Sequence, residues 1–523
     1  MKKLRIICRK SRLSLLQAEL VKKKILQVEP NAEVEIIGRS SRGDKEIGVP
    51  LSTLDGTDFF TQEIFEALQN GDAEIAVHSL KDMSAPHFFS HHAFAIIDRE
   101  DVRDVAIFNP NIIDKIKSGQ TIIIGTCAPR RESMAIHFLK KALPQLHGEI
   151  KIETRPIRGN VEGRLLQLHE GNYDGTILAT AGLNRLLMAE EEEGSEKEVA
   201  SVTQLLQNKR LMFLPLLECV PAPCQGAIVA EANPDNKEAV DLLKKINVAA
   251  IMDEVNAEKK KAYEYGTGCL QKFGVVTLRT SHGNYMYASG EDANNNSFTE
   301  WNPLPNISLA HQEIFSSTDQ MSAFFTYDWL EEKIEISEPL VFVANYKALI
   351  QPGIADLLTS KQVWASGTKT WYELAKMGVW VQGSADALGF EQWLPMLTMP
   401  LIQKSAEDIC ILTHHKAAER WKKKGKKAVS NYRLVPQLRE EIKNKITAAK
   451  GIFWSSFAQF DMYGQYAAPD AVHLCAGGET AQLLRQHGIE PAIFPTIKSF
   501  DIWRKSVTPA RKDVIGQTNI SGR

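Results

Sequence analysis

The chain has 523 residues, too many for one ordinary hydrophobic core, so we expect about three to five domains. Charged residues make up 24% and hydrophobic residues 44%, the proportions of a typical globular protein. The net charge of −2 gives no global attraction to nucleic acid or to a membrane surface, and no apolar run reaches membrane-spanning length.

The cysteines indicate a reducing compartment. Seven cysteines, an odd number at scattered positions, argue against a disulfide framework. Cys219 and Cys224 have no matching second pair, and structural zinc needs four ligands, so we predict no metal site. The apolar stretch at residues 6–8 is too short for a signal peptide. We therefore expect a cytoplasmic protein with reduced thiols.

Strands and helices alternate from the start of the chain. We expect a strand at residues 4–8, a helix capped by Ser11, a strand at 34–37, a helix at 62–69 and a strand at 73–77. The loop at residues 78–82 leaves the carboxyl end of the last of these strands. In open α/β sheets ligands gather at such loops, so this loop is a candidate site.

The alternation restarts at residue 121. We predict strands at residues 122–124, 151–153 and 176–179, with polar or glycine-bearing loops after them. Two such runs fit two α/β lobes. We interpret the Glu-rich residues 189–198 as a solvated linker or helix end. Residues 286–306, with consecutive asparagines and two prolines, indicate a loop-rich boundary.

Arginines and one acid suggest chemistry on a polyanion. Six arginines lie on or beside loops that leave strands: Arg9, Arg130, Arg131, Arg155, Arg158 and Arg164. A guanidinium group holds a carboxylate through two hydrogen bonds, although surface salt bridges are the alternative for any one arginine. Asp82 either stabilises a cation and passes a proton, or pairs with Lys81 on the surface. Cys269, on a glycine-flanked turn, is a nucleophile, an attachment point or a buried structural thiol.

These residues belong to an ordered series of motifs over about residues 4–285. The motifs are residues 5–18, Ser41-Arg42-Gly43-Asp44, Ala76 to Asp82, Gly125-Thr126 with Arg130-Arg131, Arg158 to Val161 with Arg164, Pro221 to Ala227, and Gly268-Cys269. Together they closely resemble hydroxymethylbilane synthase, also called porphobilinogen deaminase.

The resemblance implies a fold and a reaction. The fold would be α/β, with two domains that resemble periplasmic binding-protein lobes and a small α+β domain. A dipyrromethane cofactor would be bound through a thioether to Cys269. Four porphobilinogen units would lose ammonia and be added to this primer, after which water releases hydroxymethylbilane. Loss of ammonia leaves an electron-poor pyrrole that a carboxylate stabilises, so Asp82 takes the catalytic role.

Site residues follow from the match to the family's motifs. The residues implied to bind the cofactor are Cys269, Lys81, Arg130, Arg131, Arg158, Ser11 and Asp44. The residues implied to bind substrate are Arg9, Arg155 and Arg164. The arginines suit pyrrole rings that carry acetate and propionate groups. The sequence departs from the family at Gln62, where a lysine is usual, and at Cys127 and Ala128, where serines are usual.

The second half of the chain repeats one plan. Strands predicted at residues 340–344 and 451–454 end in loops, and Gly-x-x-Thr segments at 367–370 and 477–480 each open a helix. The amino ends of helices attract carboxylates. The repeat indicates paired α/β lobes.

This plan resembles uroporphyrinogen-III synthase, with Ser455-Ser456 and residues 411–436 in matching order. That family cyclises hydroxymethylbilane with inversion of the last ring and needs no cofactor. The resemblance implies that Tyr432 is catalytic, with packing as its alternative role. It implies Ser456, Gly477 and Thr480 as substrate contacts. No opening strand–helix unit is evident in residues 300–338.

The predicted fold class is α/β, a three-domain deaminase followed by a two-lobed α/β region. The expected domains are deaminase domain 1 at residues 1–98 and 199–232, domain 2 at 99–198, cofactor-attachment domain 3 at 233–300, the synthase-like region at 301–510 and a tail at 511–523. The expected small-molecule partners are porphobilinogen and hydroxymethylbilane. Two alternatives stay open, a deaminase with an inactive structural C-terminal domain and a two-lobed carboxylate-binding protein without catalysis.

Overall fold

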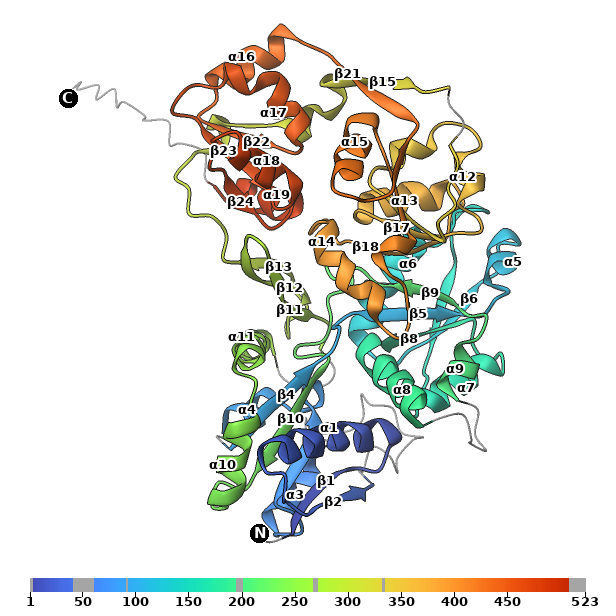
Figure 1. Cartoon of the computed structure of the whole chain (residues 1–523), viewed down its shortest axis with the longest axis vertical. Helices are drawn as coiled ribbons and strands as arrows, with labels where there is room; N and C mark the ends of the chain where they lie inside the picture. Colours follow the sequence, from blue (N-terminus) through green and yellow to red (C-terminus); the bar gives the residue numbers. More distant parts are fainter. Residues whose placement is uncertain are drawn as a thin grey trace, which may run out of the picture. The chain divides into compact units, whose positions relative to one another are not determined.

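A computed structural model of the chain describes residues 3–40, 61–90, 93–193, 201–266, 271–331 and 334–507 (Figure 1). The chain divides into two compact units. The first comprises Met1–Arg279, Asn284–Asn302 and Glu331–Asn431, and the second comprises Thr280–Gly283, Pro303–Leu330 and Tyr432–Arg523. The division passes through the region expected at 301–510, because its middle part packs with the first unit.

The N-terminal lobe of the first unit is built on a five-stranded sheet of order β2-β1-β3-β10-β4. Its strands are β1 (Leu4–Arg9), β2 (Val34–Arg39), β3 (Ile75–Ser79), β4 (Phe94–Arg99) and β10 (Ala227–Ala232). β1 pairs in parallel with β2 and β3, whereas β10 runs antiparallel between β3 and β4. The loop after β3 therefore lies at the carboxyl ends of the parallel strands, where ligands gather in such sheets.

The predicted helices of this lobe are confirmed. α1 (Arg12–Val28) begins after Ser11, whose hydroxyl accepts a hydrogen bond from the Ser14 N–H. α3 spans Gln62–Gln69, as the sequence predicted. Buried side chains of α1 and α10 (Lys237–Ile246) pack with those of the sheet in one hydrophobic core.

The middle lobe contains a second five-stranded sheet, of order β7-β6-β8-β5-β9. Its strands are β5 (Asp104–Phe108), β6 (Ile122–Gly125), β7 (Ile152–Arg155), β8 (Gly175–Ala179) and β9 (Arg210–Phe213). Its helices include α6 (Ile136–Ala142), α7 (Val161–His169) and α8 (Thr180–Glu193). The sequence analysis predicted β6, β7 and β8 but missed β5 and β9. β5 pairs in the antiparallel direction with both β8 and β9.

Two segments connect the N-terminal and middle lobes. The first crossover segment, residues 99–104, joins β4 to β5, and the second, residues 214–226, joins β9 to β10. They lie side by side, because the Glu100 N–H donates to the Gly226 carbonyl at 3.2 Å. Gly226 has a φ of +84°, and a Cβ there would come within 2.4 Å of the Glu100 oxygen. This close approach therefore requires glycine.

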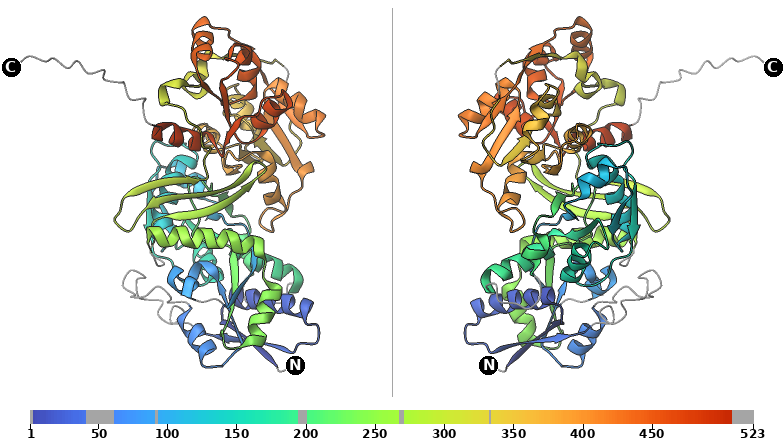
Figure 2. Two further views of the ribbon diagram at one scale, coloured as in Figure 1. Left: turned by 90° about the vertical axis from the view of Figure 1, so that its left-hand side faces the viewer. Right: turned by 90° about the vertical axis from the view of Figure 1, so that its right-hand side faces the viewer.

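A smaller α+β domain follows, with α11 (Ala249–Tyr265) and a sheet of β11 (Gly274–Thr280), β12 (Gly283–Glu291) and β13 (Ser297–Asn302). α11 runs beside this sheet (Figure 2). Its Ala262 and Tyr265 share a hydrophobic core with residues of the sheet. The predicted loop-rich boundary at 286–306 is wrong up to residue 302. Its asparagines form the turn of the β12–β13 hairpin, where Asn295 has a φ of +61°.

The C-terminal lobe, residues 340–430, completes the first unit. Its parallel sheet has the order β18-β17-β16-β19-β20. The strands are β16 (Leu340–Val343), β17 (Gln362–Ala365), β18 (Val381–Ser384), β19 (Ile409–Thr413) and β20 (Ala428–Ser430). Trp364 stacks on Phe213 with ring centroids 5.5 Å apart, and the Trp371 indole donates to the Ala142 carbonyl at 3.0 Å. The C-terminal and middle lobes thus share one hydrophobic core.

The second unit contains a parallel sheet of order β14-β22-β23-β24. The strands are β14 (Ile314–Ser316), β22 (Gly451–Trp454), β23 (Val472–Ala476) and β24 (Ala492–Phe494). β15 (Phe325–Trp329) and β21 (Tyr432–Pro436) form a separate antiparallel pair. The predicted repeat in the second half is therefore present as two parallel sheets. β14 lies within residues 300–338, where the sequence analysis found no strand.

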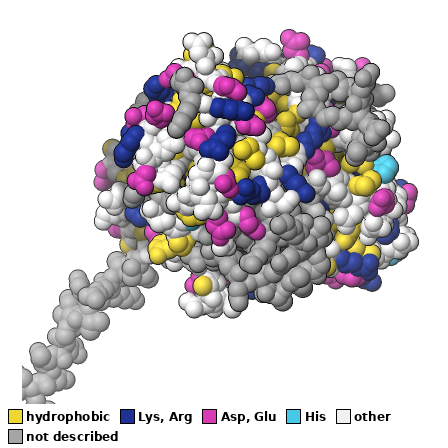
Figure 3. Space-filling model, turned by 90° about the horizontal axis from the view of Figure 1, so that it is seen from below, with side chains coloured by type: hydrophobic (Ala, Val, Ile, Leu, Met, Phe, Trp, Pro, Cys, Tyr) yellow, Lys and Arg dark blue, Asp and Glu magenta, His cyan; other side chains and the backbone are white. Residues whose placement is uncertain are grey.

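The surface and the thiols agree with the composition. On the face shown in Figure 3, basic and acidic side chains are interspersed. All six cysteines in the described ranges are free thiols. No helix among the described residues is long and apolar enough to cross a membrane. The same residues contain no group of three or more His, Cys, Asp or Glu side chains able to hold a metal ion.

Candidate active site

The loop after β3 carries the first candidate residues. Leu80–Asp82 forms a single 3-10 turn, η2, anchored by the fully buried Leu80. One residue earlier, the Ser79 hydroxyl accepts a hydrogen bond from Gln17 Nε2 at 2.8 Å, which ties the loop to α1. Lys81 and Asp82 are half-buried at this position. The turn therefore presents an ammonium group and a carboxylate next to each other.

Arg130 and Arg131, after β6, are both buried and share one carboxylate. Arg130 Nη2 donates to Asp104 Oδ2 at 2.7 Å, and Arg131 Nη2 donates to Asp104 Oδ1 at 2.8 Å. Arg131 also opens a π-helical turn, η3 (Arg131–Ala135), a feature frequent at functional sites. Burial alone would raise the pKa of Asp104, but the two guanidinium groups outweigh it and hold this pKa well below its usual range.

Asp104 is the functional candidate that the sequence analysis missed. It opens β5, a strand that was not predicted, and no motif quoted above includes it. The Gln225 amide also donates to Asp104 Oδ1, at 2.9 Å, and Arg130 Nη1 donates to the Val220 carbonyl at 2.5 Å. Asp104 thus connects the arginine pair to both crossover segments. The nearest sequence signal is an acid directly before the apolar run at residues 105–108.

Arg158 and Arg164 flank the amino end of α7. Arg164 Nε donates to the Gly159 carbonyl at 2.9 Å, which leaves its terminal nitrogens for other partners. Burial and the nearby positive charges of Arg131 and Arg158 lower the pKa of Arg164 to about 10. Asp82 acts in the opposite direction on the same group, so it lies within electrostatic range of Arg164.

Among the described residues of this site, cations outnumber carboxylates. Burial lowers the pKa of Lys81, and Arg131 and Arg130 lower it further, while Asp82 and Asp104 oppose the change. We call this set the cationic cluster: Lys81, Asp82, Asp104, Arg130, Arg131, Arg158 and Arg164. Arg130 and Arg131 are buried with one carboxylate between them among the residues that the structure describes, and this arrangement favours a ligand with acid groups.

Other predicted residues lie at strand and helix ends. Arg9 is the last residue of β1, and Ser11 caps α1. Arg155 ends β7, and its Nε donates to Glu153 Oε1 at 3.0 Å in a pair whose side chains are about half exposed. That is the surface salt bridge considered for single arginines. Asp44 and Cys269 lie outside the described residues.

In the second unit, polar loops follow adjacent parallel strands. After β14, the Ser317 hydroxyl accepts the Ser455 N–H at 2.8 Å and donates to Ser455 Oγ at 3.1 Å. After β22, the Ser456 N–H donates to Gln459 Oε1 at 3.1 Å at the start of α17 (Phe457–Tyr463). These contacts hold the two strand-end loops together.

A histidine side chain of the protein binds the Gly-x-x-Thr loop after β23. Thr480 lies in the first turn of α18 (Glu479–Gln486). The Gly478 N–H at the start of this helix donates to His282 Nε2 at 3.0 Å. A Cβ at Gly477 would come within 3.1 Å of the His282 ring. His282, in the turn between β11 and β12, was not predicted at this loop.

Tyr432 is buried in the β15–β21 pair. It is opposite Trp329 in the register, and its ring packs against Trp329 and Tyr327 with centroids 5.7 and 6.0 Å apart. Its exposed fraction is 1%. Burial raises its pKa well above the usual range. Tyr432 therefore lies on a different element from the loops that carry Ser456, Gly477 and Thr480.

Comparison with known proteins identifies the first half. Residues 4–241 match the family model described as "Porphobilinogen deaminase, dipyromethane cofactor binding domain". The porphobilinogen deaminase of Nitrosomonas europaea is 33% identical over 289 residues, which cover 53% of this chain and 83% of that protein. The chain belongs to the porphobilinogen deaminase family. The porphobilinogen deaminase of Chromobacterium violaceum is 34% identical over 278 residues, which cover 53% of this chain and 80% of that protein.

Solved structures add nothing to this assignment. A periplasmic substrate-binding protein of an ABC transporter from Coxiella burnetii is 18% identical and covers 50% of this chain, with a TM-score of 0.25. The effector-binding domain of BenM with benzoate is 14% identical and covers 48%, also with a TM-score of 0.25. Scores this low support no argument.

Family membership gives the deaminase its substrate, porphobilinogen, its product, hydroxymethylbilane, and its cofactor, dipyrromethane. The cationic cluster fits the cofactor, because the acid side chains of a dipyrromethane supply the carboxylates that the cluster lacks. Lys81, Arg130, Arg131 and Arg158 are the residues able to hold these acids. The fit rests on charge and on the chemistry of the donors.

Two departures from the usual deaminase sequence lie beside this site. Cys127 Sγ donates to the Ile157 carbonyl at 3.1 Å, and the Ala128 N–H donates to Thr126 Oγ1 at 3.2 Å. Cys127 therefore joins the loop after β6 to the loop after β7. Gln62, the third departure, donates to Glu66 at 3.0 Å on α3, and it remains exposed. The loop before Arg130 is thus hydrogen-bonded without the usual serines.

Proposed function

We propose that the cationic cluster binds the acid groups of dipyrromethane and porphobilinogen, and that Asp82 is the catalytic residue. In this proposal Lys81, Arg130, Arg131 and Arg158 hold the cofactor and Arg164 holds substrate. The two buried guanidinium groups of Arg130 and Arg131, which share the one carboxylate of Asp104 at 2.7 and 2.8 Å, carry the proposal. Two positive charges and one negative charge leave a net positive charge among these three residues.

The position of Asp82 suggests its role. Because its carboxylate lies near both Lys81 and Arg164, a cofactor held by Lys81 and a substrate held by Arg164 would each have a pyrrole ring close to Asp82. Positive charge develops on the substrate ring as the amino group of its aminomethyl substituent leaves as ammonia, and the carboxylate stabilises it. The same oxygens can accept a proton that the reaction releases. Bound dipyrromethane supplies the pyrrole carbon that accepts each unit and keeps the growing chain attached at Cys269.

We propose further that the second half is a uroporphyrinogen-III synthase-like domain that cyclises hydroxymethylbilane. Polar loops at the carboxyl ends of β14, β22 and β23 support this proposal, since ligands gather at such ends. Ser456, Gly477 and Thr480 would contact substrate carboxylates there. Tyr432 would contribute to catalysis only if it became accessible from its buried position.

The second candidate function for the second half of the chain is a structural role without catalysis. Its support is the hydrophobic core that the C-terminal lobe shares with the middle lobe, which includes Trp364 and Phe213. The Trp380 indole adds a hydrogen bond to the Leu211 carbonyl at 3.1 Å. A lobe packed in this way stabilises the deaminase whether or not it acts on hydroxymethylbilane.

One experiment separates these functions. The purified chain is incubated with porphobilinogen, the product is oxidised, and the uroporphyrin isomer is identified by chromatography. Predominantly type III product would support both activities. Predominantly type I would mean that the deaminase works and that the C-terminal region does not act on its product. Absence of turnover by protein that carries the cofactor would contradict the deaminase proposal.

A further inference from the structure

One carboxylate of the C-terminal lobe joins both crossover segments. Asp386, between β18 and α14 (Phe390–Trp393), is 2% exposed. Its Oδ2 accepts a hydrogen bond from Arg103 Nη2, in the first crossover segment, at 3.0 Å. Its Oδ1 accepts the N–H of Leu216, in the second crossover segment, at 2.8 Å. The two segments that connect the N-terminal and middle lobes are therefore fixed to a third lobe.

The backbone at Asp386 indicates that this position is strongly determined. Asp386 has a φ of +53° and Ala387 a φ of +58°, values that non-glycine residues rarely adopt. Such conformations persist only where the surrounding structure imposes them, and they concentrate at functional positions. Hydrogen bonds from the Asp386 N–H to Ser384 Oγ and from the Ala387 N–H to the Ser366 carbonyl hold the turn.

The α+β domain provides an independent example of the same arrangement. Glu258 on α11 is fully buried and accepts Arg99 Nη2 at 2.8 Å. Its Oε2 also accepts the Cys224 N–H at 2.7 Å. Arg99 belongs to the first crossover segment and Cys224 to the second. Glu258 and Asp386 thus each hold one guanidinium group of the first segment and one backbone N–H of the second.

The crossover segments also position the deaminase site. Arg103 directly precedes Asp104, whose carboxylate orients Arg130 and Arg131. The second segment supplies the Val220 carbonyl that accepts Arg130 Nη1. A shift of either segment therefore moves the guanidinium groups that we assign to the cofactor.

The segments have space in which to shift. A cavity of about 440 Å³ lies against them, and its lining includes Arg103, Leu216, Glu254 and Ala385. Without the charge of Asp386, the Arg103 side chain could turn into this space, since Asp101 is the one other acid that pairs with it among the described residues.

We propose that Asp386 is a positioning residue for porphobilinogen deamination. It acts through Arg103 and Leu216, and through them on the placement of Arg130 and Arg131. Asp386 lies beyond residues 4–241, which match the deaminase family model. The C-terminal lobe thus contributes to the first reaction whether or not it catalyses the second. The inference rests on the deaminase activity alone, not on the proposed synthase activity.

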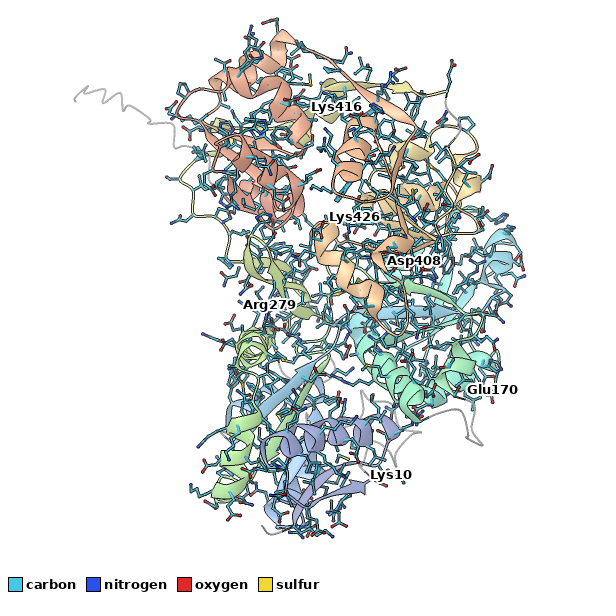
Figure 4. The ribbon with its side chains drawn as sticks, viewed as in Figure 1. Lys10, Glu170, Arg279, Asp408, Lys416 and Lys426 are labelled. Carbon is cyan, nitrogen blue, oxygen red and sulfur yellow. The ribbon has the colours of Figure 1, made fainter. Side chains whose placement is uncertain are left out.

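The test compares three variants of the full chain that carries its cofactor. Asp386→Asn keeps an oxygen that can accept the Leu216 N–H but removes the charge that holds Arg103. Trp380→Phe removes a hydrogen bond between the same lobes at 3.1 Å without contact to a crossover segment. Asp408→Asn changes a half-buried acid of the same lobe, whose carboxylate accepts hydrogen bonds from the nearby Ser405 (Figure 4). Steady-state turnover of porphobilinogen, thermal unfolding and the intact mass of the enzyme during turnover are measured.

For Asp386→Asn we expect kcat to fall about tenfold, because small displacements of binding groups slow a positioned reaction, while KM changes less than about twofold. Partly elongated enzyme should accumulate in the mass spectrum. Trp380→Phe and Asp408→Asn should keep the wild-type kcat and mass distribution. A general loss of stability would lower the melting temperature but would not make partly elongated enzyme accumulate.

Several outcomes would overturn the proposal. An unchanged kcat and mass distribution in Asp386→Asn would reduce Asp386 to a packing contact. Equal losses in Asp386→Asn and Trp380→Phe would assign the effect to the interface in general. If Asp386→Asn does not fold, the neutral pair R103Q/D386N takes its place with the same expectations. Wild-type turnover is the reference, so failure of the deaminase assignment itself is seen separately.

Discussion

In the functions proposed above, the cationic cluster of the first unit and the strand-end loops of the second unit would bind similar acid groups by different means. The cluster uses side-chain charge, and Asp104 neutralises part of that charge within the protein. The loops use hydroxyl groups and backbone N–H groups such as those of Ser317 and Gly478. Buried positive charges need a nearby carboxylate if the protein is to fold without its ligand, and Asp104 provides one. An uncharged loop needs only a hydrogen-bond partner for its N–H groups, and His282 provides one.

The largest expected effect is on turnover and follows from replacing Asp82. Asp82→Asn should lower turnover of porphobilinogen by about 10²–10⁴-fold, because it removes a carboxylate placed to stabilise charge and move a proton. Asp82 is half-buried, so the fold should persist, as circular dichroism would show. Glu170→Gln, at an exposed acid after α7, is the matched control and should turn over normally. Turnover within threefold of wild type in Asp82→Asn would remove Asp82 from the mechanism.

The next effect concerns the internal counter-charge. Asp104→Asn leaves Arg130 and Arg131 buried without their carboxylate, which should lower the free energy of unfolding by about 3–5 kcal/mol. Glu153→Gln, in the half-exposed pair with Arg155, should cost less than about 1 kcal/mol. Chemical denaturation measures both values. Equal losses would mean that Asp104 does not compensate the arginines.

The stability that Asp104 contributes depends on pH. The folded-state pKa of Asp104 is lower than its unfolded value, so its contribution to stability is fully present above about pH 4 and is lost as the pH falls further. Asp104→Asn should therefore reduce acid sensitivity in that range. An unchanged difference in stability between wild type and variant down to low pH would contradict the assignment.

A smaller effect is expected at the loop of the second unit. Burial, aided by the positive charge of Arg485, lowers the pKa of His282, so at neutral pH its ring is an uncharged acceptor for Gly478. If this loop binds a substrate carboxylate, His282→Ala should lower the KM for hydroxymethylbilane by about threefold to tenfold. His487→Ala, an exposed histidine at the end of α18, is the control. A raised KM in His282→Ala would mean that His282 supports the loop instead of competing for it.

This contact also depends on pH. Because the folded-state pKa of His282 is lower than its unfolded value of about 6.5, the contact stabilises the protein fully above that pH and is lost as the pH falls through the folded-state value. Wild type should therefore approach His282→Ala in mild acid. A constant KM ratio between the two proteins across this range would contradict the role of the histidine.

The last comparison separates two arginines of the same predicted set. Arg164→Ala should lower kcat/KM for porphobilinogen by at least about tenfold, since it removes a buried cation near Asp82. Arg155 is about half exposed and already paired with Glu153, so Arg155→Ala should change kcat/KM by less than about threefold. Equal losses would return Arg155 to the substrate-binding set on the same footing as Arg164.

The sequence by itself determined the local elements and the chemistry of the first half. Periodicity and capping located β1, α1, α3 and β6, because these signals lie within a few residues of one another. Arginines after strand ends indicated a polyanionic ligand, and family membership supplied the cofactor and substrate. The three-residue β14 was missed, since so short a strand has almost no pattern of its own.

Only the tertiary structure decided which charges compensate which. Asp104 meets the arginine pair across 26 residues, Asp386 meets Arg103 across 283, and His282 meets Gly478 across 196. No periodic pattern encodes a contact between such distant positions. Each depends on how complete sheets and lobes pack, and burial then gives these few polar contacts their strength. The sequence therefore indicated the arginine pair, and only packing revealed Asp104, Asp386 and His282 as partners.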